Sequence, residues 1–166
     1  MTDDAIRFPV RKRIRLPREV YREGHAFLVT KGTAQRHPWF SQFPGLANAC
    51  VELIASLGVQ RDAEPYAWCV MPDHIHLLLH DRDPVDYIRL LKGRLTPVAR
   101  RLEQRRRLWQ RSFHDHGLRR EGSLEQVAQY IWENPVRAEI VATPALYPWS
   151  GSAFWPHWRD HYDSAQ

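Results

Sequence analysis

The decisive stretch of this sequence reads Pro65-Tyr-Ala-Trp-Cys-Val-Met71, then Pro72-Asp73, then His74-Ile-His-Leu-Leu-Leu-His80. Two apolar runs rich in strand-forming residues flank a short turn signal, which is typical of a β-hairpin. We therefore expect two adjacent antiparallel strands in the middle of a sheet.

The segments before this hairpin predict one strand and one helix. Residues 25–30 read His-Ala-Phe-Leu-Val-Thr and form the strand, and residues 31–43 form a loop with breakers at Gly32 and Pro38. Residues 44–57 form a helix that we expect to stop at Gly58. Its apolar residues recur at helical spacing, at Leu46, Cys50, Leu53, Ile54 and Leu57.

After the hairpin, Asp83-Pro84 opens a second helix that Pro97 should kink or split. Residues 108–113 then predict a fourth strand, and a last helix begins at Ser123 and breaks before Pro135. The second helix places one apolar face at Ile88, Leu91, Leu95, Val98 and Leu102. The last helix has a core stripe at Leu124, Val127, Ala128 and Ile131.

The element order is therefore β-α-β-β-α-β-α, which predicts an α+β fold of the ferredoxin-like (split βαβ) type. We expect an antiparallel sheet with helices on one face, the other face free for a ligand, and an added C-terminal helix that carries Tyr130.

The charge distribution indicates a nucleic-acid partner. The chain of 166 residues has a net charge of +5, and residues 89–120 hold eleven Lys and Arg but only two acids. Of the 24 basic residues 21 are Arg, whose planar donor fork suits phosphate. The alternative is a solvated helix face in a genome biased toward Arg codons. The candidate DNA contacts are Arg11, Lys12, Arg13, Lys92, Arg94, Arg105, Arg106, Arg107, Arg119 and Arg120.

Other classes are disfavoured. No apolar run reaches the roughly 18 residues of a membrane helix, and the acidic Met1-Thr2-Asp3-Asp4 start lacks the layout of a secretion signal. Cys50 and Cys69 cannot make a CxxC zinc site, and we expect both to be buried thiols in a cytoplasmic protein.

His74 and His76 form the sharpest chemical feature. Residues i and i+2 of a strand share a face, so the two imidazoles emerge together while Ile75 enters the opposite core. Such a pair can bind one divalent metal ion. The alternative is two ordinary surface histidines. The run His114-Asp115-His116 is either a second metal site or a structural end of the fourth strand.

Tyr130 and Asn134 lie one turn apart on the last helix and are therefore neighbours. A tyrosine can attack a phosphodiester if a metal ion neutralises the phosphate, and the Asn134 amide oxygen is a reasonable third ligand for Mg²⁺ or Mn²⁺. Without that context, Tyr130 would be read as a residue that packs at the sheet edge. Trp132 is a weak candidate for base stacking.

Several ordered motifs together resemble a known family. Ala67-Trp-Cys-Val-Met-Pro-Asp-His-Ile-His-Leu-Leu-Leu79 is similar to the His-hydrophobic-His strand of the IS200-like Y1 transposases, members of the HUH endonuclease superfamily. Trp109-Gln-Arg-Ser-Phe-His-Asp-His116 with Arg119, Tyr130-Ile-Trp-Glu-Asn-Pro-Val-Arg137 and Tyr147-Pro-Trp-Ser150 resemble the REP-associated tyrosine transposase branch. The resemblance runs from about residue 10 to residue 155.

The resemblance implies a metal-dependent single-strand DNA endonuclease and strand transferase that acts on REP-type hairpins. Tyr130 would form a 5′-phosphotyrosine, and His74, His76 and Asn134 would be the metal ligands, with Mg or Mn as the ion. It also implies a bacterial, nucleoid-associated protein, for which we expect a monomer. The expected division is a basic arm at 1–24, the catalytic domain at 25–146 and an aromatic tail at 147–166.

Two other functions stay open on the sequence. One is a nucleic-acid-binding module without catalysis, which would place exposed aromatics on the central strands. The other is a metal hydrolase that activates water and forms no covalent intermediate.

Overall fold

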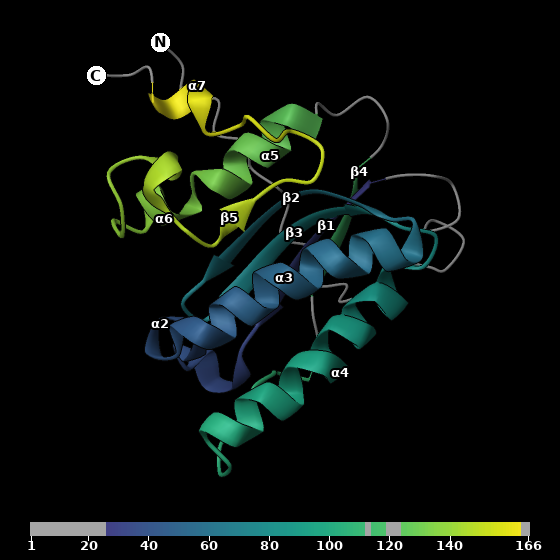
Figure 1. The fold of residues 1–166 in the computed structure, drawn as a ribbon, viewed down its shortest axis with the longest axis vertical. Coiled ribbons are helices and arrows are strands. Elements are labelled where there is room, and N and C mark those ends of the chain that lie inside the picture. The colour runs from purple at the N-terminus through teal and green to yellow at the C-terminus, as the bar shows by residue number, and fades with distance from the viewer. Residues whose placement is uncertain (1–25, 112–113, 119–123, 164–166) are drawn as a thin grey trace.

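The computed structural model describes residues 26–111, 114–118 (backbone) and 124–163. Within these ranges the chain forms one antiparallel sheet in the order β4-β1-β3-β2-β5 (Figure 1). The strands are β1 (Ala26–Gly32), β2 (Glu64–Met71), β3 (His74–His80), β4 (His114–Leu118) and the two-residue β5 (Ser150–Gly151). The first four have the order of a split βαβ fold, so the predicted ferredoxin-like α+β class is confirmed.

The predicted hairpin forms at the centre of this sheet. Met71 of β2 pairs with His74 of β3 across the Pro72-Asp73 turn. On the other side of β3, His76 lies opposite Thr30 of β1. Residues directly opposite each other on neighbouring strands share a face, so this register brings Thr30 beside the paired histidines.

Two helices cover one face of the sheet. They are α3 (Pro44–Arg61) and α4 (Pro84–Leu102), which lie in front of the strands in Figure 1. A single apolar core joins them to alternate strand residues such as Val29, Ile75 and Leu77. The 33–43 connection contains the 3-10 turn η1 (Ala34–Arg36) and the short helix α2 (Trp39–Gln42), which buries Trp39 and Phe40.

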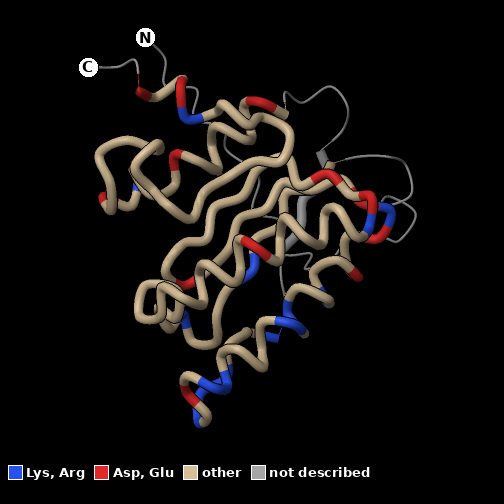
Figure 2. Tube along the Cα trace, viewed as in Figure 1, with Lys and Arg blue, Asp and Glu red and all other residues tan. Residues whose placement is uncertain are grey.

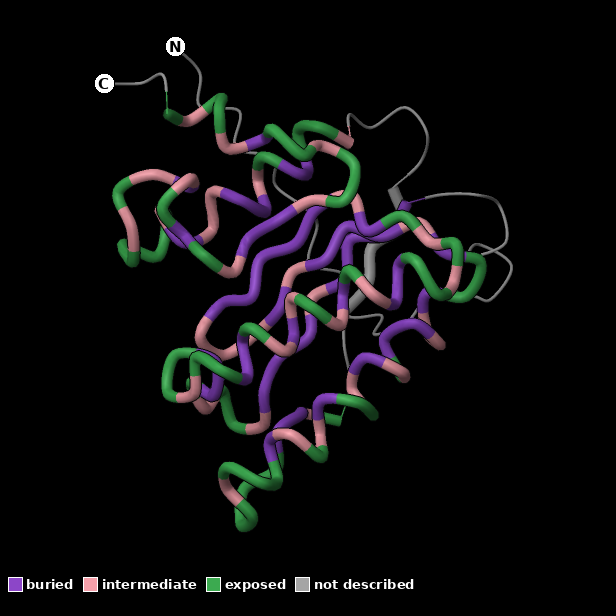
Figure 3. The backbone as a smooth tube through the Cα atoms, in the orientation of Figure 1, coloured by how far each residue is buried: buried purple, intermediate pink, exposed green. Residues whose placement is uncertain are grey.

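The opposite face is also covered, so the expectation of a free face was wrong. Helix α5 (Leu124–Trp132) and the segment after it pack there, and a second core joins Leu28, Cys69 and Leu78 to Val127 and Ile131. The later elements are α6 (Asn134–Arg137), η2 (Pro144–Leu146) and α7 (Asp160–Asp163). Strands β1, β2 and β3 are therefore buried between two layers (Figure 3). The aromatic tail contributes Tyr147 and Trp158 to the second core.

Helices α3 and α4 each differ from the sequence prediction near the C-terminal end. Helix α3 continues through Gly58 to Arg61 and ends at Asp62, which adopts the left-handed conformation with φ 53°. Gly58 instead lies against Pro65, where a Cβ atom would be 2.9 Å from Cδ. Leu102, predicted in the apolar face of α4, is 46% exposed because the helix there extends beyond the core.

Pro97 does not split α4, which is one continuous helix from Pro84 to Leu102. A proline removes one intrahelical hydrogen bond, and the ladder on both sides of it persists. Leu95 and Ala99, which flank Pro97, are both buried and so hold the two halves of the helix against the core.

The fourth strand was predicted at the wrong residues. Leu108 and Trp109 are buried, and the backbone there forms only an isolated bridge between Thr33 and Trp109. The strand that pairs with β1 is His114–Leu118, so the run His114-Asp115-His116 begins the strand instead of ending it. Residues 112–113 and Ser123, where the last helix was predicted to begin, lie outside the described residues.

None of the helices in the described ranges has the length and apolar character needed to cross a lipid bilayer. Cys50 and Cys69 are buried free cysteines, as predicted.

Candidate active site

The paired histidines lie on the face of β3 that α5 covers. Strand alternation sends Ile75 into the α3/α4 core, where it is 2% exposed, and turns His74 and His76 to the other side. Their Nε2 atoms lie 3.0 Å apart. Two metal–ligand bonds of about 2.1 Å at a right angle place their donor atoms about 3.0 Å apart, so the pair has the spacing of two ligands of one ion.

The second nitrogen of each ring is held by another residue. His74 Nδ1 lies 2.6 Å from Asp73 Oδ1, and His76 Nδ1 lies 3.0 Å from Thr30 Oγ1. Asp73 is in turn paired with Arg36 at 2.8 Å. Metal-binding histidines are typically oriented in this way by a partner on the far ring nitrogen, so both Nε2 atoms are preoriented toward each other.

Burial keeps the two imidazoles neutral. It is the main cause that lowers the pKa of His76 to about 3, and the nearby His74, Arg137 and Arg36 lower this pKa further. Burial also lowers the pKa of His74, although Asp73 opposes that shift. A neutral imidazole offers a nitrogen lone pair to a cation, so the pair is in the ligating state at neutral pH.

The predicted third metal ligand, Asn134, lies on another element than the two histidines. Within the described ranges, no further His, Cys, Asp or Glu joins the pair in a cluster of three. The Asn134 amide nitrogen donates to the carbonyl oxygens of Tyr130 (3.2 Å) and Ile131 (3.1 Å). Asn134 begins α6 and does not continue α5 with Tyr130, although the sequence predicted both on one helix. Its described hydrogen bonds stay within this helical region, and none of them joins it to His74 or His76. His80 lies at the far end of β3, beside Glu64.

Tyr130 is half-buried near the end of α5, the helix that packs on β2 and β3. The guanidinium of Arg137 lies 4.2 Å from the centroid of its ring, and Arg137 Nη2 donates to the Tyr130 carbonyl oxygen at 2.5 Å. The charge of Arg137 also acts on His76. Arg137 therefore contacts Tyr130 directly, and its charge lowers the pKa of His76.

The basic candidates separate into three groups. Lys92, Arg105, Arg106 and Arg107 line one cavity between α4 and the segment that follows it, where Lys and Arg gather at the lower end of the molecule in Figure 2. Arg94 is not among the residues that line it and donates to Gln60 at 2.8 Å. Arg11, Lys12, Arg13, Arg119 and Arg120 lie outside the described residues.

Four neighbours of the site were not singled out from the sequence. Asp73 and Arg137 stood inside the quoted motifs, next to His74 and seven residues after Tyr130. Thr30 and Arg36 had no signal, because only the strand register and the fold of the 33–43 connection bring them to the histidines. Trp132 is not a stacking platform, since it is 3% exposed, stacks on Trp158 and donates to the Gly151 carbonyl.

Comparison with known proteins identifies the family of this chain. The sequence model of the family described as "Transposase IS200 like" matches residues 24–134. A Haemophilus influenzae protein whose name assigns it to the REP-associated tyrosine transposases is 32% identical over 101 residues, which are 52% of this chain and 57% of that protein. The chain thus spans little more than half the length of this relative.

A solved structure of a REP-associated tyrosine transposase bound to a REP hairpin has the same fold. It superposes with a TM-score of 0.61 and 22% identity over 76% of each chain. Since the family model covers well over half of the sequence, including both histidines, Tyr130 and Asn134, the chain belongs to the IS200-like transposases.

Proposed function

We propose that this protein is a metal-dependent single-strand DNA endonuclease and strand transferase of the REP-associated branch, acting on hairpin DNA in the bacterial cytoplasm. The observation that carries the proposal is the 3.0 Å separation of two Nε2 atoms whose rings are fixed by Asp73 and Thr30. Family membership and the hairpin bound to the solved relative support the choice of DNA substrate.

The residues fit a divalent ion. His74, His76 and the amide oxygen of Asn134 would hold it, and Mg²⁺ or Mn²⁺ would neutralise and orient the scissile phosphate as a Lewis acid. Neutral imidazoles at ligand spacing support this assignment. Within the site, Asp73 and Thr30 would keep both rings oriented.

Tyr130 would be the nucleophile. Its Oη forms a bond to phosphorus while the bond from phosphorus to the 3′ oxygen breaks. The phenol proton is lost to solvent, and the leaving oxygen takes up a proton. The products are a 5′-phosphotyrosine and a free 3′-hydroxyl, and attack by another 3′-hydroxyl reverses the step and joins strands. Arg137, 4.2 Å from the ring centroid, would orient the phenol during attack.

The chain would divide its work between a catalytic region and basic regions that contact DNA. Residues 25–146 would carry the activity, residues 1–24 and the basic residues after α4 would contact the DNA backbone, and the protein would act as a monomer near the nucleoid. Size-exclusion chromatography with light scattering tests the monomer, with and without hairpin DNA.

The decisive test is a covalent adduct. The protein is incubated with a labelled hairpin oligonucleotide carrying a single-stranded flank, with Mg²⁺, Mn²⁺ or EDTA, and resolved on a denaturing gel. We expect a metal-dependent adduct that is absent in Tyr130→Phe and retained in the matched control Tyr66→Phe, whose hydroxyl contacts Glu64.

The other outcomes identify the rivals. Cleavage that survives Tyr130→Phe would indicate a hydrolase that uses activated water. Tight hairpin binding without cleavage by the wild-type protein would indicate a binding module. An adduct unaffected by EDTA would remove the metal from the proposal.

A further inference from the structure

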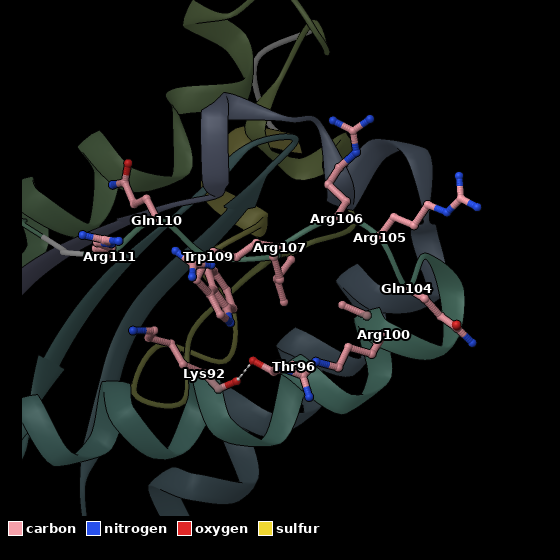
Figure 4. A pocket seen from close by; sticks show the side chains of 12 residues that line it. Lys92, Thr96, Arg100, Gln104, Arg105, Arg106, Arg107, Trp109, Gln110 and Arg111 are labelled. Carbon is pink, nitrogen blue, oxygen red and sulfur yellow. Dashed lines mark hydrogen bonds between the residues drawn. The ribbon is translucent and has the colours of Figure 1, made fainter.

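A basic cavity lies between α4 and the segment after it. Its volume is about 520 Å³, and it is lined by residues of α4 and by residues 104–111. In Figure 4 the side chains of Lys92, Thr96 and Arg100 face that segment across the opening, with Trp109 between them. Six lining residues are Lys or Arg and none is acidic: Lys92, Arg100, Arg105, Arg106, Arg107 and Arg111. The cavity therefore selects for an anion.

The wall of this cavity contains a buried donor that lacks an acceptor. Trp109 is 6% exposed, and its Nε1 has no hydrogen-bond partner among the described residues. A buried N–H without an acceptor is unfavourable. The cationic side chains around it can only donate. The lining residues that could accept, Thr96, Gln104 and Gln110, are not hydrogen-bonded to it. The missing acceptor would therefore arrive with a ligand.

The cavity lies at the histidine end of the sheet. Thr33 forms a bridge with Trp109, the Gln110 amide donates to the Gly32 carbonyl, and Gly32 lies opposite His74. With neighbouring strands about 4.8 Å apart, residues 109–110 lie roughly two strand spacings, about 10 Å, from β3. Because Trp109 belongs to the α3/α4 core, a DNA strand leaving the histidine pair would pass over the end of the sheet to reach it.

We propose that this cavity binds one internucleotide phosphate of the substrate DNA strand, with Trp109 Nε1 and Arg100 as donors. The proposal rests on the proposed function, since it takes the strand that is cleaved as the ligand. A phosphate fits better than a base, because the buried indole offers its N–H but little of its ring face for stacking. The long side chains at the opening can move aside at little cost to admit it.

The test measures binding without chemistry. Fluorescence anisotropy is recorded in EDTA with a labelled hairpin that carries a single-stranded flank. Internucleotide phosphates are replaced one at a time by neutral methylphosphonate. Trp109→Phe removes the N–H and keeps an apolar ring, Arg100→Gln removes one cation, and Arg101→Gln is the matched control on the same helix, since Arg101 does not line the cavity. Thermal unfolding checks that each variant is folded.

We expect one linkage in the flank whose neutralisation weakens wild-type binding about tenfold, as for the loss of a hydrogen bond to a charged group. Trp109→Phe should weaken binding to normal DNA. Neutralising that linkage should then cost less than in the wild type, because only the contact with Arg100 is left to lose, and the salt dependence should be unchanged. Arg100→Gln should lower the slope of log K against log salt by about 0.7, and inorganic phosphate at equal ionic strength should not displace the DNA.

Three results overturn the proposal. The first is a Trp109→Phe variant that binds with wild-type affinity whichever linkage is neutralised. The second is the same dependence of affinity on the neutralised linkage in Arg100→Gln and Arg101→Gln. The third is a wild-type protein that does not bind the oligonucleotide. If Trp109→Phe unfolds, the comparison of Arg100→Gln with Arg101→Gln still decides. If one linkage depends on Trp109 but the protein forms no covalent adduct, the enzymatic function is refuted and the phosphate site stands. If the adduct forms but no linkage depends on Trp109, the phosphate site is refuted and the enzymatic function stands.

Discussion

Replacing Thr30 with valine removes the hydroxyl that holds His76 and changes little else. The two side chains have nearly the same shape, and both suit a strand. The hydroxyl lies 3.0 Å from His76 Nδ1. It is suited to this position because it both donates and accepts, so it satisfies His76 whichever ring nitrogen carries the proton. Valine would leave that buried nitrogen without a partner.

The expected effect is on metal affinity. Removing a hydrogen bond that orients a metal-binding histidine typically costs 10- to 100-fold in affinity, or about 1.4–2.8 kcal/mol. We expect the Mn²⁺ concentration for half-maximal adduct formation to rise by about that factor in Thr30→Val, while the rate at saturating Mn²⁺ stays near the wild-type rate. The assay is adduct formation on the hairpin oligonucleotide over a Mn²⁺ titration.

Two controls make this prediction sharp. Thr30→Ser keeps the hydroxyl and should restore the wild-type metal dependence. Thr143→Val makes the same chemical change where the hydroxyl accepts only from Ala145 of its own turn, and it should have no effect. A Thr30→Val variant with unchanged metal dependence but a reduced maximal rate would refute the argument, because Thr30 would then act on the chemical step.

Three further variants test other parts of the structure. Arg137→Lys keeps the charge but loses the planar contact with the Tyr130 ring; we expect the single-turnover rate of adduct formation to fall about tenfold, and an unchanged rate would contradict a positioning role. Gly151→Ala would drive a Cβ atom into the indole of Trp68, so chemical denaturation should show a loss of about 1–3 kcal/mol. Tyr147→Phe removes the 2.7 Å hydrogen bond to the Val70 carbonyl and should cost about 1–3 kcal/mol in the same measurement. Unchanged stability of Tyr147→Phe would contradict the packing described for the second face, and unchanged stability of Gly151→Ala would contradict the close approach of Gly151 to Trp68.

The fold was predictable where local pattern and tertiary packing agree. The hairpin from Pro65 to His80 and the helix stripes depend on periodicity, and the structure confirms them except at Leu102, which is exposed. The fourth strand failed because Leu108 and Trp109 are apolar for a different reason, namely packing into the α3/α4 core beside an isolated bridge. Pairing with β1, which defines the true strand at His114–Leu118, is a long-range property that no local pattern contains.

The site shows the same limit at the level of single side chains. The i, i+2 rule places His74 and His76 together from sequence alone, and the structure brings their Nε2 atoms within 3.0 Å. Thr30 is 46 residues from His76 and meets it only through the register of β1 against β3. Sequence spacing therefore identifies groups on one element, whereas groups that orient them from another element require the fold.

The error about the free face has a consequence for how the proposed DNA substrate would approach. Helix α5 packs on the same face as the histidine pair through Val127, Ala128 and Ile131, and this packing is what holds a tyrosine near the end of that helix in a defined place. A sheet face that was open along its length would leave the nucleophile without support. Since the layer of α5 and the aromatic tail closes most of this face, a phosphate would have to reach the histidines from the end of the sheet where Asp73 and Arg36 lie. The basic cavity around Trp109 lies at that same end, so a strand entering there would meet cations before it meets the paired imidazoles.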